Sequence, residues 1–332
     1  MKKLPYQEKL IKIIRSQLPE STNLSAEVGK ILGVSADSAY RRLRCETAFT
    51  LDEMALVCQS YMIPLESLTD FMGSVVSFRY KPVGDDLGEF RSFLQYFLGQ
   101  IKSISEFEMR EVIYAAEDIP LFHVYMRPHL SSFKFFYWRK AILNHAELQD
   151  AKFKIEEADS ELLELAKKAS AAYAEVPSTE IWTEETIAST VQQIKFFWEA
   201  AMFESREDVE VVINDLEELI RNLQRQCDLG LKFKPGGVLT QTPFTCYASD
   251  LMIGNNCVLV KTGDRRTTFL GYNTFNFMNT GNPEFNKQHE YWISNLMSKS
   301  TQISRAAEKI RSQFFKALLK KVTELRKFVE EN

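Results

Sequence analysis

The stretch "GVSADSAYRRLRCETAFTLDE", residues 33–53, places three arginines on what the sequence predicts to be one short helix. Ser35 can cap that helix, because a serine hydroxyl accepts hydrogen bonds from the N–H groups of a first turn. Helical spacing predicts a buried stripe made of Ala36, Ala39, Tyr40 and Leu43. The opposite face then holds Ser38, Arg41 and Arg42, with Asp37 and Arg44 beside them. The net charge of the whole chain is -4, so these arginines form a local basic face on an acidic protein.

The flanking residues predict a bundle of four or five short helices. Apolar residues recur at helical spacing from residue 4 to residue 18, and Asn23 or Ser25 can cap a second helix that Gly33 ends. Thr50 and Glu53 fit a capping box at the start of "LDEMALVCQSYMI", residues 51–63. Two short helices joined by a tight turn, with arginines facing outward on the second, are typical of a helix-turn-helix, whose second helix fits the DNA major groove.

The run "LSAEVGKILGVSADSAYRRLRCETAFTLDEMALVCQSYMIPLESL", residues 24–68, resembles the Cro and phage-repressor (XRE-like) class of helix-turn-helix domains, especially its BetR-like bacterial variant. The likeness covers about residues 5–72. Four residues stand where that class has its helix-packing positions: Gly29, Gly33, Val34 and Ala39. The chain departs from the class at Arg42, where phage repressors often have an apolar residue, and Leu43 takes over the packing role.

The resemblance implies a DNA-contacting role for particular residues. Those expected near base edges are Ser35, Ala36 and Asp37, followed by Ser38 and Arg41. Asp37 would accept from a cytosine amino group, and Arg41 would pair with guanine. Those expected at phosphates are Arg42, Arg44 and Ser25. The alternative is a solvated helix face whose arginines pair with Asp37 or Glu46.

Beyond this region the sequence predicts a second, larger domain. Residues 73–88 mix Gly, Pro and Asp with little periodicity, and we interpret them as a linker between a helix-turn-helix domain at 1–72 and a domain at 89–332. Helical patterns occupy residues 89–104, 157–174, 184–203 and 208–229. The last of these has the apolar spacing of a helix-pair seam, with a partner in the same chain or in a second subunit.

Strand patterns complete the predicted fold. Two are "REVIYAA", residues 110–116, and "EIW", residues 180–182. Four more follow residue 231, namely "FTCYAS", "CVLVK", "TTFLGY" and "NTFNFM", and predict a small antiparallel sheet. A long amphipathic helix, in one or two pieces, begins near residue 283. The predicted fold class is mainly α with a small antiparallel sheet (α+β), consisting of a helix-turn-helix bundle and a larger α+β domain.

Composition and spacing argue against other classes of function. The 332 residues are 45% apolar and 26% charged, as in an ordinary folded chain of two or three domains. No stretch approaches the roughly 18 apolar residues of a membrane span, so we expect a cytoplasmic protein without membrane contact. Nucleotide-binding, zinc-protease and serine-hydrolase motifs are missing from the sequence, and we expect no catalytic residue, metal or cofactor. Cys246 and Cys257 would lie on neighbouring strands; we favour reduced packing thiols over a redox pair.

These observations favour a sequence-specific DNA-binding transcription regulator. Its expected partners are double-stranded DNA, a second copy of the chain in a homodimer, and an unknown small-molecule effector sensed by residues 89–332. An alternative is an enzyme or protein-interaction module in residues 89–332 that carries an accessory helix-turn-helix. A third interpretation is a helix-turn-helix used for protein contacts alone.

Overall fold

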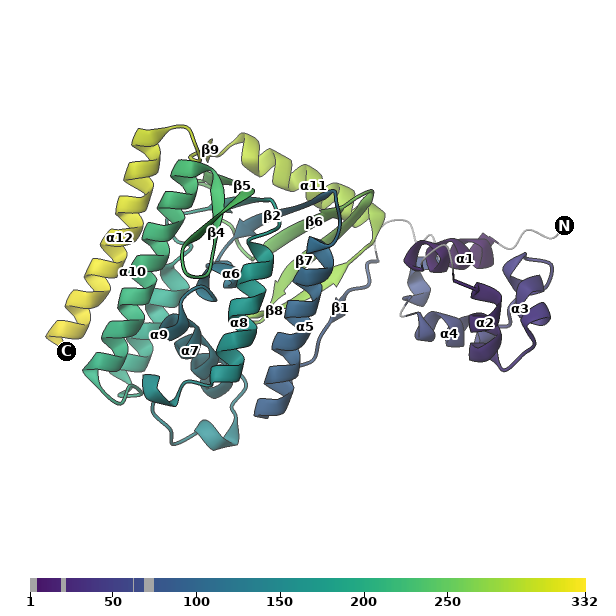
Figure 1. Ribbon diagram of the computed structural model, residues 1–332, viewed down its shortest axis with the longest axis horizontal. Coiled ribbons are helices and arrows are strands. Elements are labelled where there is room, and N and C mark those ends of the chain that lie inside the picture. Colours follow the sequence, from purple (N-terminus) through teal and green to yellow (C-terminus); the bar gives the residue numbers. More distant parts are fainter. Residues whose placement is uncertain (1–4, 19–21, 62, 69–74) are drawn as a thin grey trace. The chain divides into compact units, whose positions relative to one another are not determined.

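The chain of the computed structural model divides into two compact units, residues 1–77 and 78–332 (Figure 1). The structure describes residues 5–18, 22–61, 63–68 and 75–332. The predicted domain boundary between residues 72 and 73 lies outside the described residues. Strand β1 (Arg79–Tyr80) pairs antiparallel with β8 (Asn276–Thr280), so two residues assigned to the linker belong to the sheet of the second unit. A strand of two residues is too short to leave a periodic pattern in the sequence.

The N-terminal unit is a bundle of short helices, as the sequence predicts. Its elements are α1 (Pro5–Gln17), α2 (Leu24–Leu32), α3 (Ala36–Leu43), α4 (Leu51–Ser60) and the 3-10 turn η1 (Leu65–Leu68). One apolar cluster holds them together and includes Leu10, Ile14, Val28, Leu43 and Val57. The bundle therefore has its own core, formed by one apolar face from each helix.

The sheet of the C-terminal unit is larger than the sequence predicts. Among the described residues nine strands form one sheet, in the order β1-β8-β7-β6-β2-β3-β5-β4, with β9 paired to β5. The remaining strands are β2 (Arg110–Ala116), β3 (Ser178–Trp182), β4 (Leu231–Lys234), β5 (Val238–Ala248), β6 (Cys257–Thr262), β7 (Arg265–Tyr272) and β9 (Thr301–Gln302).

The α+β fold class is confirmed, but the prediction of a small antiparallel sheet is wrong. β3 runs parallel to both β2 and β5, so the sheet is mixed. Parallel neighbours need a long crossover connection, and here helices connect β2 to β3 and β3 to β5. The strand patterns in the sequence locate individual strands, and they carry no information about which distant strands pair or in which direction.

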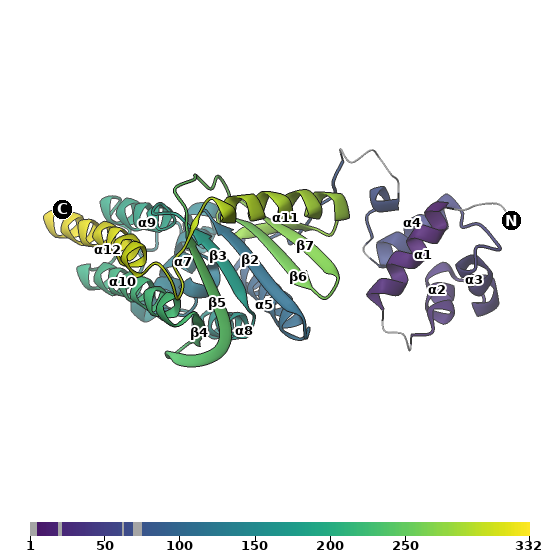
Figure 2. The ribbon, with the colours of Figure 1, turned by 90° about the horizontal axis from the view of Figure 1, so that it is seen from above.

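Helices cover both faces of this sheet. They are α5 (Leu87–Ser105), α6 (Leu121–Val124), α7 (Pro128–Tyr137) with the π turn η2 (Trp138–Ile142), the 3-10 turns η3 (Ala146–Leu148) and η4 (Ile155–Glu157), α8 (Ser160–Tyr173), α9 (Ala188–Glu199), α10 (Arg206–Leu229), α11 (Pro283–Ser298) and α12 (Glu308–Glu331). Figure 2 shows α11 on one face and α5 and α8 on the other. Ile113 of β2 packs with Ile293 of α11, whereas Tyr114 belongs to the core on the α5 side. The seam predicted along α10 has its partners in the same chain, α12 and α7.

The two cysteines considered as a redox pair do not lie on neighbouring strands. Cys246 is in β5 and Cys257 in β6, and β3 and β2 separate them in the sheet. Cys246 instead lies beside Cys227 of α10; a hydrogen bond to Cys227, together with burial, raises the pKa of Cys246 well above its ordinary value. The prediction that they lie on neighbouring strands is therefore wrong, because β5 and β6 follow one another in the chain without being neighbours in the sheet; both cysteines are free thiols.

Candidate nucleic-acid interface

The turn between α2 and α3 is fixed by two glycines. Gly33 ends α2 with a left-handed φ of 66°, which glycine adopts without strain. Gly29 lies so close to the next turn that a Cβ atom there would be 3.0 Å from the carbonyl oxygen of Val34. Asn23, one of the two candidate caps, accepts a hydrogen bond from the N–H of Ala26 at 3.2 Å. These contacts set the angle between the two helices, and Figure 1 shows α3 beside α2.

Helix α3 has one face in the bundle and one face in solvent. The residues on or next to the bundle are Ser38, Ala39, Arg42 and Leu43, and the exposed residues are Ala36, Asp37, Tyr40, Arg41 and Arg44. The prediction that Ala36 and Tyr40 are buried is wrong, since the Tyr40 residue is 48% exposed. Ala39 and Leu43 alone make the buried stripe, because they lie four residues apart on one side of the helix. The Tyr40 ring faces outward, with the guanidinium of Arg44 5.7 Å from its centroid.

Arg42 is held inside the N-terminal unit by two sets of hydrogen bonds. Its Nε and Nη2 atoms donate to Glu53 at 3.1 and 2.7 Å, and its Nη1 donates to the hydroxyl of Ser38 at 2.7 Å. Glu53 also belongs to the predicted capping box, where it accepts from the N–H of Thr50 at 3.0 Å. The hydrogen bond from Arg42 lowers the pKa of Glu53 below its ordinary value. Arg42 thus joins α3 to the start of α4.

Gln7 of α1, to which the sequence pattern assigned no role, holds the segment that follows α3. Its side chain is buried, donates to the carbonyl oxygens of Arg42 and Thr47 at 2.7 and 2.9 Å, and accepts from the N–H of Phe49 at 2.8 Å. The signal for this role was present, because Gln7 continues the helical spacing of the buried residues Leu10, Ile11 and Ile14. A polar residue at a core position needs buried partners.

Arg41 of α3 and Arg44, the residue that follows α3, remain exposed. Arg41 pairs with Asp37 at 3.4 Å and Arg44 pairs with Glu46 at 3.2 Å, the two carboxylates named by the alternative interpretation. Exposed ion pairs of this kind contribute about 0–1 kcal/mol, so a base or a phosphate can replace the carboxylate at little cost. Ser35 caps α3 by accepting from the N–H of Ser38 at 3.2 Å, and Ser25 lies in the first turn of α2.

The C-terminal unit contains a separate cluster of buried polar groups around Glu180 of β3. The carboxylate accepts hydrogen bonds from His123 at 2.9 Å, from the hydroxyl of Tyr173 at 2.7 Å and from the indole of Trp182 at 2.9 Å. Burial by itself raises the pKa of Glu180, but His123 and Lys232 outweigh burial and bring the pKa to about 2. This carboxylate therefore stays ionised in the core.

Lys232 of β4 completes the cluster. Its ammonium lies 3.3 Å from the centroid of the Tyr173 ring and donates to the Tyr173 carbonyl oxygen at 3.0 Å. Burial lowers the pKa of Lys232 to about 7, and Glu180 offsets only part of this effect. Each polar group in the cluster is bonded to another member of it, which is the arrangement expected of a structural network.

The depressed pKa of Lys232 predicts a stability that increases with pH. Between pH about 7 and the ordinary lysine value of about 10.4, the unfolded chain binds a proton that the folded chain releases, so the free energy of unfolding increases. Between pH 7 and 8.5 the free energy of unfolding of the wild type should increase by about 1–2 kcal/mol more than that of Lys232→Met. Urea unfolding followed by tryptophan fluorescence measures this difference. Parallel pH profiles for the two proteins would contradict it.

Two other kinds of feature, a metal site and a membrane-spanning helix, are absent from the described part of the chain. No three His, Cys, Asp or Glu side chains there gather closely enough to hold a metal ion. No helix within those same ranges is both long enough and apolar enough to cross a membrane.

Comparison with known families supports the resemblance of the N-terminal unit. Residues 10–76 match the BetR domain, a DNA-binding domain of the helix-turn-helix type. The match includes α2, α3 and the Arg42–Glu53 contact, and it ends before the C-terminal unit begins at residue 78. No curated protein and no solved structure matches the chain.

Proposed function

We propose that this chain is a sequence-specific transcription regulator whose N-terminal unit reads DNA with α3 and whose C-terminal unit dimerises and senses a small molecule. The observation that carries the proposal is the exposed face of α3, where Asp37, Tyr40, Arg41 and Arg44 lie together beyond a turn of fixed angle. An α-helix fits the major groove, and donors and acceptors on its first turns meet base edges there. The BetR match over the same residues supports this use of the helix.

The exposed and buried residues of α3 have different proposed roles. Arg41 pairs with a guanine, Asp37 accepts from a cytosine amino group, and Ser35 and Ala36 lie at base edges. Arg44 contacts phosphate, and so does Ser25 through the first turn of α2. We assign Arg42 and Ser38 a positioning role instead, because their side chains are bonded to each other and Arg42 is bonded to Glu53. Arg42 thus supports the reading helix from behind.

Dimerisation follows from how little DNA one such unit reads. A single helix-turn-helix contacts few base pairs, so selective binding calls for two copies on half-sites about 34–36 Å apart. Met252, in the loop before β6, and Tyr291, on α11, are apolar or aromatic residues that are 92% and 77% exposed. We propose that these two side chains take part in the dimer contact. Light scattering that shows a monomer at micromolar concentration would contradict the homodimer.

The enzyme alternative would need polar groups gathered in an accessible pocket. The polar groups around Glu180 are buried and bonded to one another. We therefore propose a structural role for that cluster and no catalysis in the C-terminal unit. The protein-contact interpretation of the helix-turn-helix is decided by the DNA-binding experiment that follows.

Arg41→Ala is expected to weaken binding to the preferred DNA site by about 1–3 kcal/mol, which is the usual discrimination carried by a bidentate arginine–guanine pair. The site is first selected from random duplexes with the full-length protein, and affinity is then measured by fluorescence anisotropy. We expect the variant to lose discrimination at one base pair of each half-site. Arg15→Ala, at an exposed position of α1, removes the same charge and is the matched control.

Variants at Arg44 and Arg42, measured in the same assay, distinguish a phosphate contact from a positioning role. Arg44→Ala should weaken binding to all sequences equally and reduce the salt slope by about one. Arg42→Met should leave that slope unchanged while destabilising the unit. Failure to select any DNA site, or equal affinities for wild type and all three α3 variants, would reject DNA reading by this helix.

A further inference from the structure

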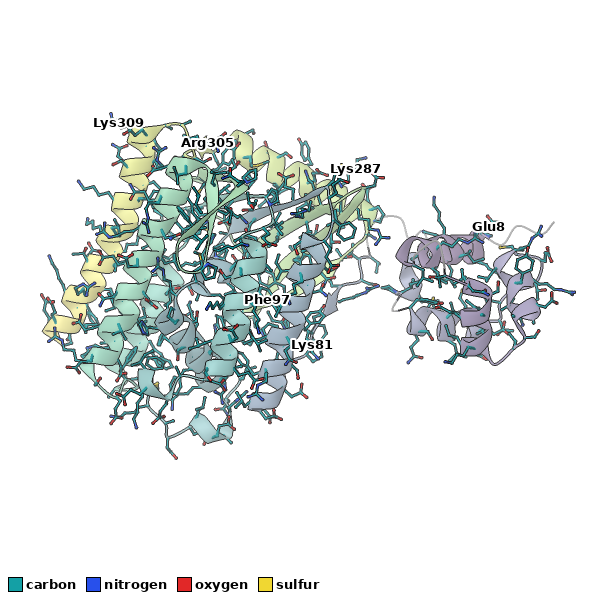
Figure 3. The ribbon with its side chains drawn as sticks, in the orientation of Figure 1. Glu8, Lys81, Phe97, Lys287, Arg305 and Lys309 are labelled. Atoms are coloured by element: carbon teal, nitrogen blue, oxygen red, sulfur yellow. The ribbon has the colours of Figure 1, made fainter. Side chains whose placement is uncertain are left out.

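The core of the C-terminal unit contains a cavity on the face of the sheet that α5 covers. Its volume is about 80 Å³, and its walls come from α5, α6 and four strands of the sheet. Phe97 of α5, labelled in Figure 3, and Phe122 of α6 form one side, and Val112 and Val260 lie on the sheet side. Gln100, an exposed residue of α5, lies at the rim, so the cavity opens toward solvent there.

The chemistry of the walls restricts what can bind. None of the described residues that line the cavity is charged, and most are aromatic or aliphatic. An ionised ligand would lose its hydration without gaining a counter-charge, a cost of several kcal/mol. Mainly apolar pockets with a few polar groups are the usual form of small-molecule sites.

Tyr114 of β2 is one of the polar residues that line the cavity. The residue is only 2% exposed, lines the cavity, and forms no hydrogen bond through its hydroxyl to any residue that the structure describes. A hydroxyl in an apolar cavity gains from a partner inside it, because a hydrogen bond left unmade costs about 1–3 kcal/mol. Burial raises the pKa of Tyr114 well above its ordinary value, so the hydroxyl stays neutral and can donate or accept.

We propose that this cavity binds a neutral, mainly apolar small molecule whose one polar atom hydrogen-bonds to the hydroxyl of Tyr114, and that this molecule is the effector of the regulator. The assignment as effector rests on the sensing role proposed above. One ring or a short chain fills the enclosed part, and the rest of the molecule lies at the rim beside Gln100.

The cavity is built on the strand that holds the segment leading to the N-terminal unit. Asn279 of β8 lines the cavity and is paired with Arg79 of β1, the first strand after residue 77. Asn276, another lining residue, donates to the carbonyl oxygen of Lys81 at 2.7 Å. A ligand that shifts β8 therefore changes the anchorage of the chain where it leaves the DNA-reading unit.

The cavity also contacts the buried charge cluster. The ring of Phe97 stacks on Phe122 with centroids 5.0 Å apart, and Phe122 stacks on Tyr173 with centroids 4.1 Å apart. Tyr173 donates to Glu180 at 2.7 Å. This continuous stack gives the cavity a rigid inner wall, so we expect ligand-induced movement at β8 and the rim.

The test uses the full-length protein and two dyes that differ in charge. N-Phenyl-1-naphthylamine is neutral, and 8-anilinonaphthalene-1-sulfonate has the same rings with a sulfonate added. We expect the neutral dye to bind saturably at one site per chain and at least about tenfold more tightly than the anionic dye. Ile104→Trp, which places an indole at the cavity wall, should weaken the neutral dye at least about tenfold, whereas Ser103→Trp on the exposed side of α5 should leave it within about twofold.

Removing single hydroxyls tests the proposed hydrogen bond. Tyr114→Phe should weaken the neutral dye by about three- to tenfold. Tyr125→Phe is the matched control: the hydroxyl of Tyr125 is also buried without a partner among the described residues and its ring lies against Phe97, but Tyr125 does not line the cavity, so the loss of its hydroxyl should leave the affinity for the dye unchanged. Equal affinity for the two dyes, no saturable binding of the neutral dye, or no effect of Ile104→Trp in a folded protein would each overturn the site.

The dye assay and the DNA assay test the cavity and the regulator function independently of each other. The dye titrations contain no DNA, so Arg41→Ala should leave them unchanged whether or not α3 reads DNA. If the dye binds as expected but has no effect on affinity for the selected DNA site, then the cavity is a binding site and the effector assignment is overturned. If DNA binding fails while the dye results hold, the proposed regulator function is overturned and the site remains.

Discussion

Replacing Glu180 by glutamine is expected to lower the free energy of unfolding of the C-terminal unit by about 3–5 kcal/mol, the usual cost of leaving one half of a buried ion pair without its partner. The carboxylate accepts from three different donors, and Lys232 lies nearby in the same core. A glutamine has one oxygen to accept with, and its NH2 group would face donors. The substitution changes almost no volume, so the loss would report charge and hydrogen bonding.

Tryptophan fluorescence measures this loss in the intact chain. The chain has 4 tryptophans, and all of them lie in residues 78–332, so urea unfolding followed by their emission reports the C-terminal unit alone. Glu184→Gln, at an exposed position two residues after Trp182, should change the free energy of unfolding by no more than about 0.5 kcal/mol. A loss below about 1 kcal/mol for Glu180→Gln would mean that the cluster is hydrated and that its groups are not coupled as the distances indicate.

The same carboxylate predicts how the unit responds to acid. The pKa of Glu180 in the folded chain, about 2, is below the ordinary value of about 4.3, so its stabilising contribution is complete above that ordinary value. The contribution is lost as the pH falls through about 2. Glu180→Gln should therefore flatten the acid side of the stability profile.

Gln7→Leu is expected to destabilise the N-terminal unit by about 2–4 kcal/mol, because it leaves three backbone groups without the partners that Gln7 provides. Leucine is close in size to glutamine, so packing changes little. Two of these groups, at Thr47 and Phe49, belong to the segment after α3. We expect Gln7→Leu to disorder that segment and, as a result, to lower the affinity for DNA.

Hydrogen exchange of the full-length protein, read by mass spectrometry, separates the two units. Peptides from residues 1–77 should lose protection in Gln7→Leu, and peptides from residues 78–332 should not. Gln59→Leu, at an exposed position of α4, is the matched control. Unchanged protection in Gln7→Leu would show that water replaces the side chain at all three backbone groups.

The elements that the sequence predicted well are those with local signals. Gly33, the Ser35 cap and the Thr50–Glu53 capping box all act within four residues of their partners, and each one lies where the pattern placed it. The parallel pairing of β2 and β3 depends instead on strands 62 or more residues apart, and no local pattern encodes it.

The candidate interface shows the same limit. The sequence of α3 predicts a helix with one buried and one exposed face. In the structure Arg42 lies against the bundle and Tyr40 lies in solvent, which is the reverse of what is expected for a charged and an aromatic residue. The partner of Arg42 is Glu53, eleven positions away. The sequence explains Glu53 by the capping box alone, so the pattern gives no reason to expect a second partner for it. The sequence does contain a signal for the Glu180 cluster, because Glu180 is a carboxylate inside a strand whose other residues are mostly buried. Such a carboxylate needs buried partners.

The resemblance to phage repressors places Arg42 where that class often has an apolar residue, and this difference changes what holds α3 in place. An apolar contact is almost indifferent to acid and salt, whereas the bond between Arg42 and Glu53 weakens when the carboxylate takes up a proton. The orientation of α3 therefore depends in part on an ion pair. Because Arg42 lowers the pKa of Glu53 below its ordinary value of about 4.3, the pair persists at neutral pH, and only stronger acid would loosen α3 while every arginine keeps its charge.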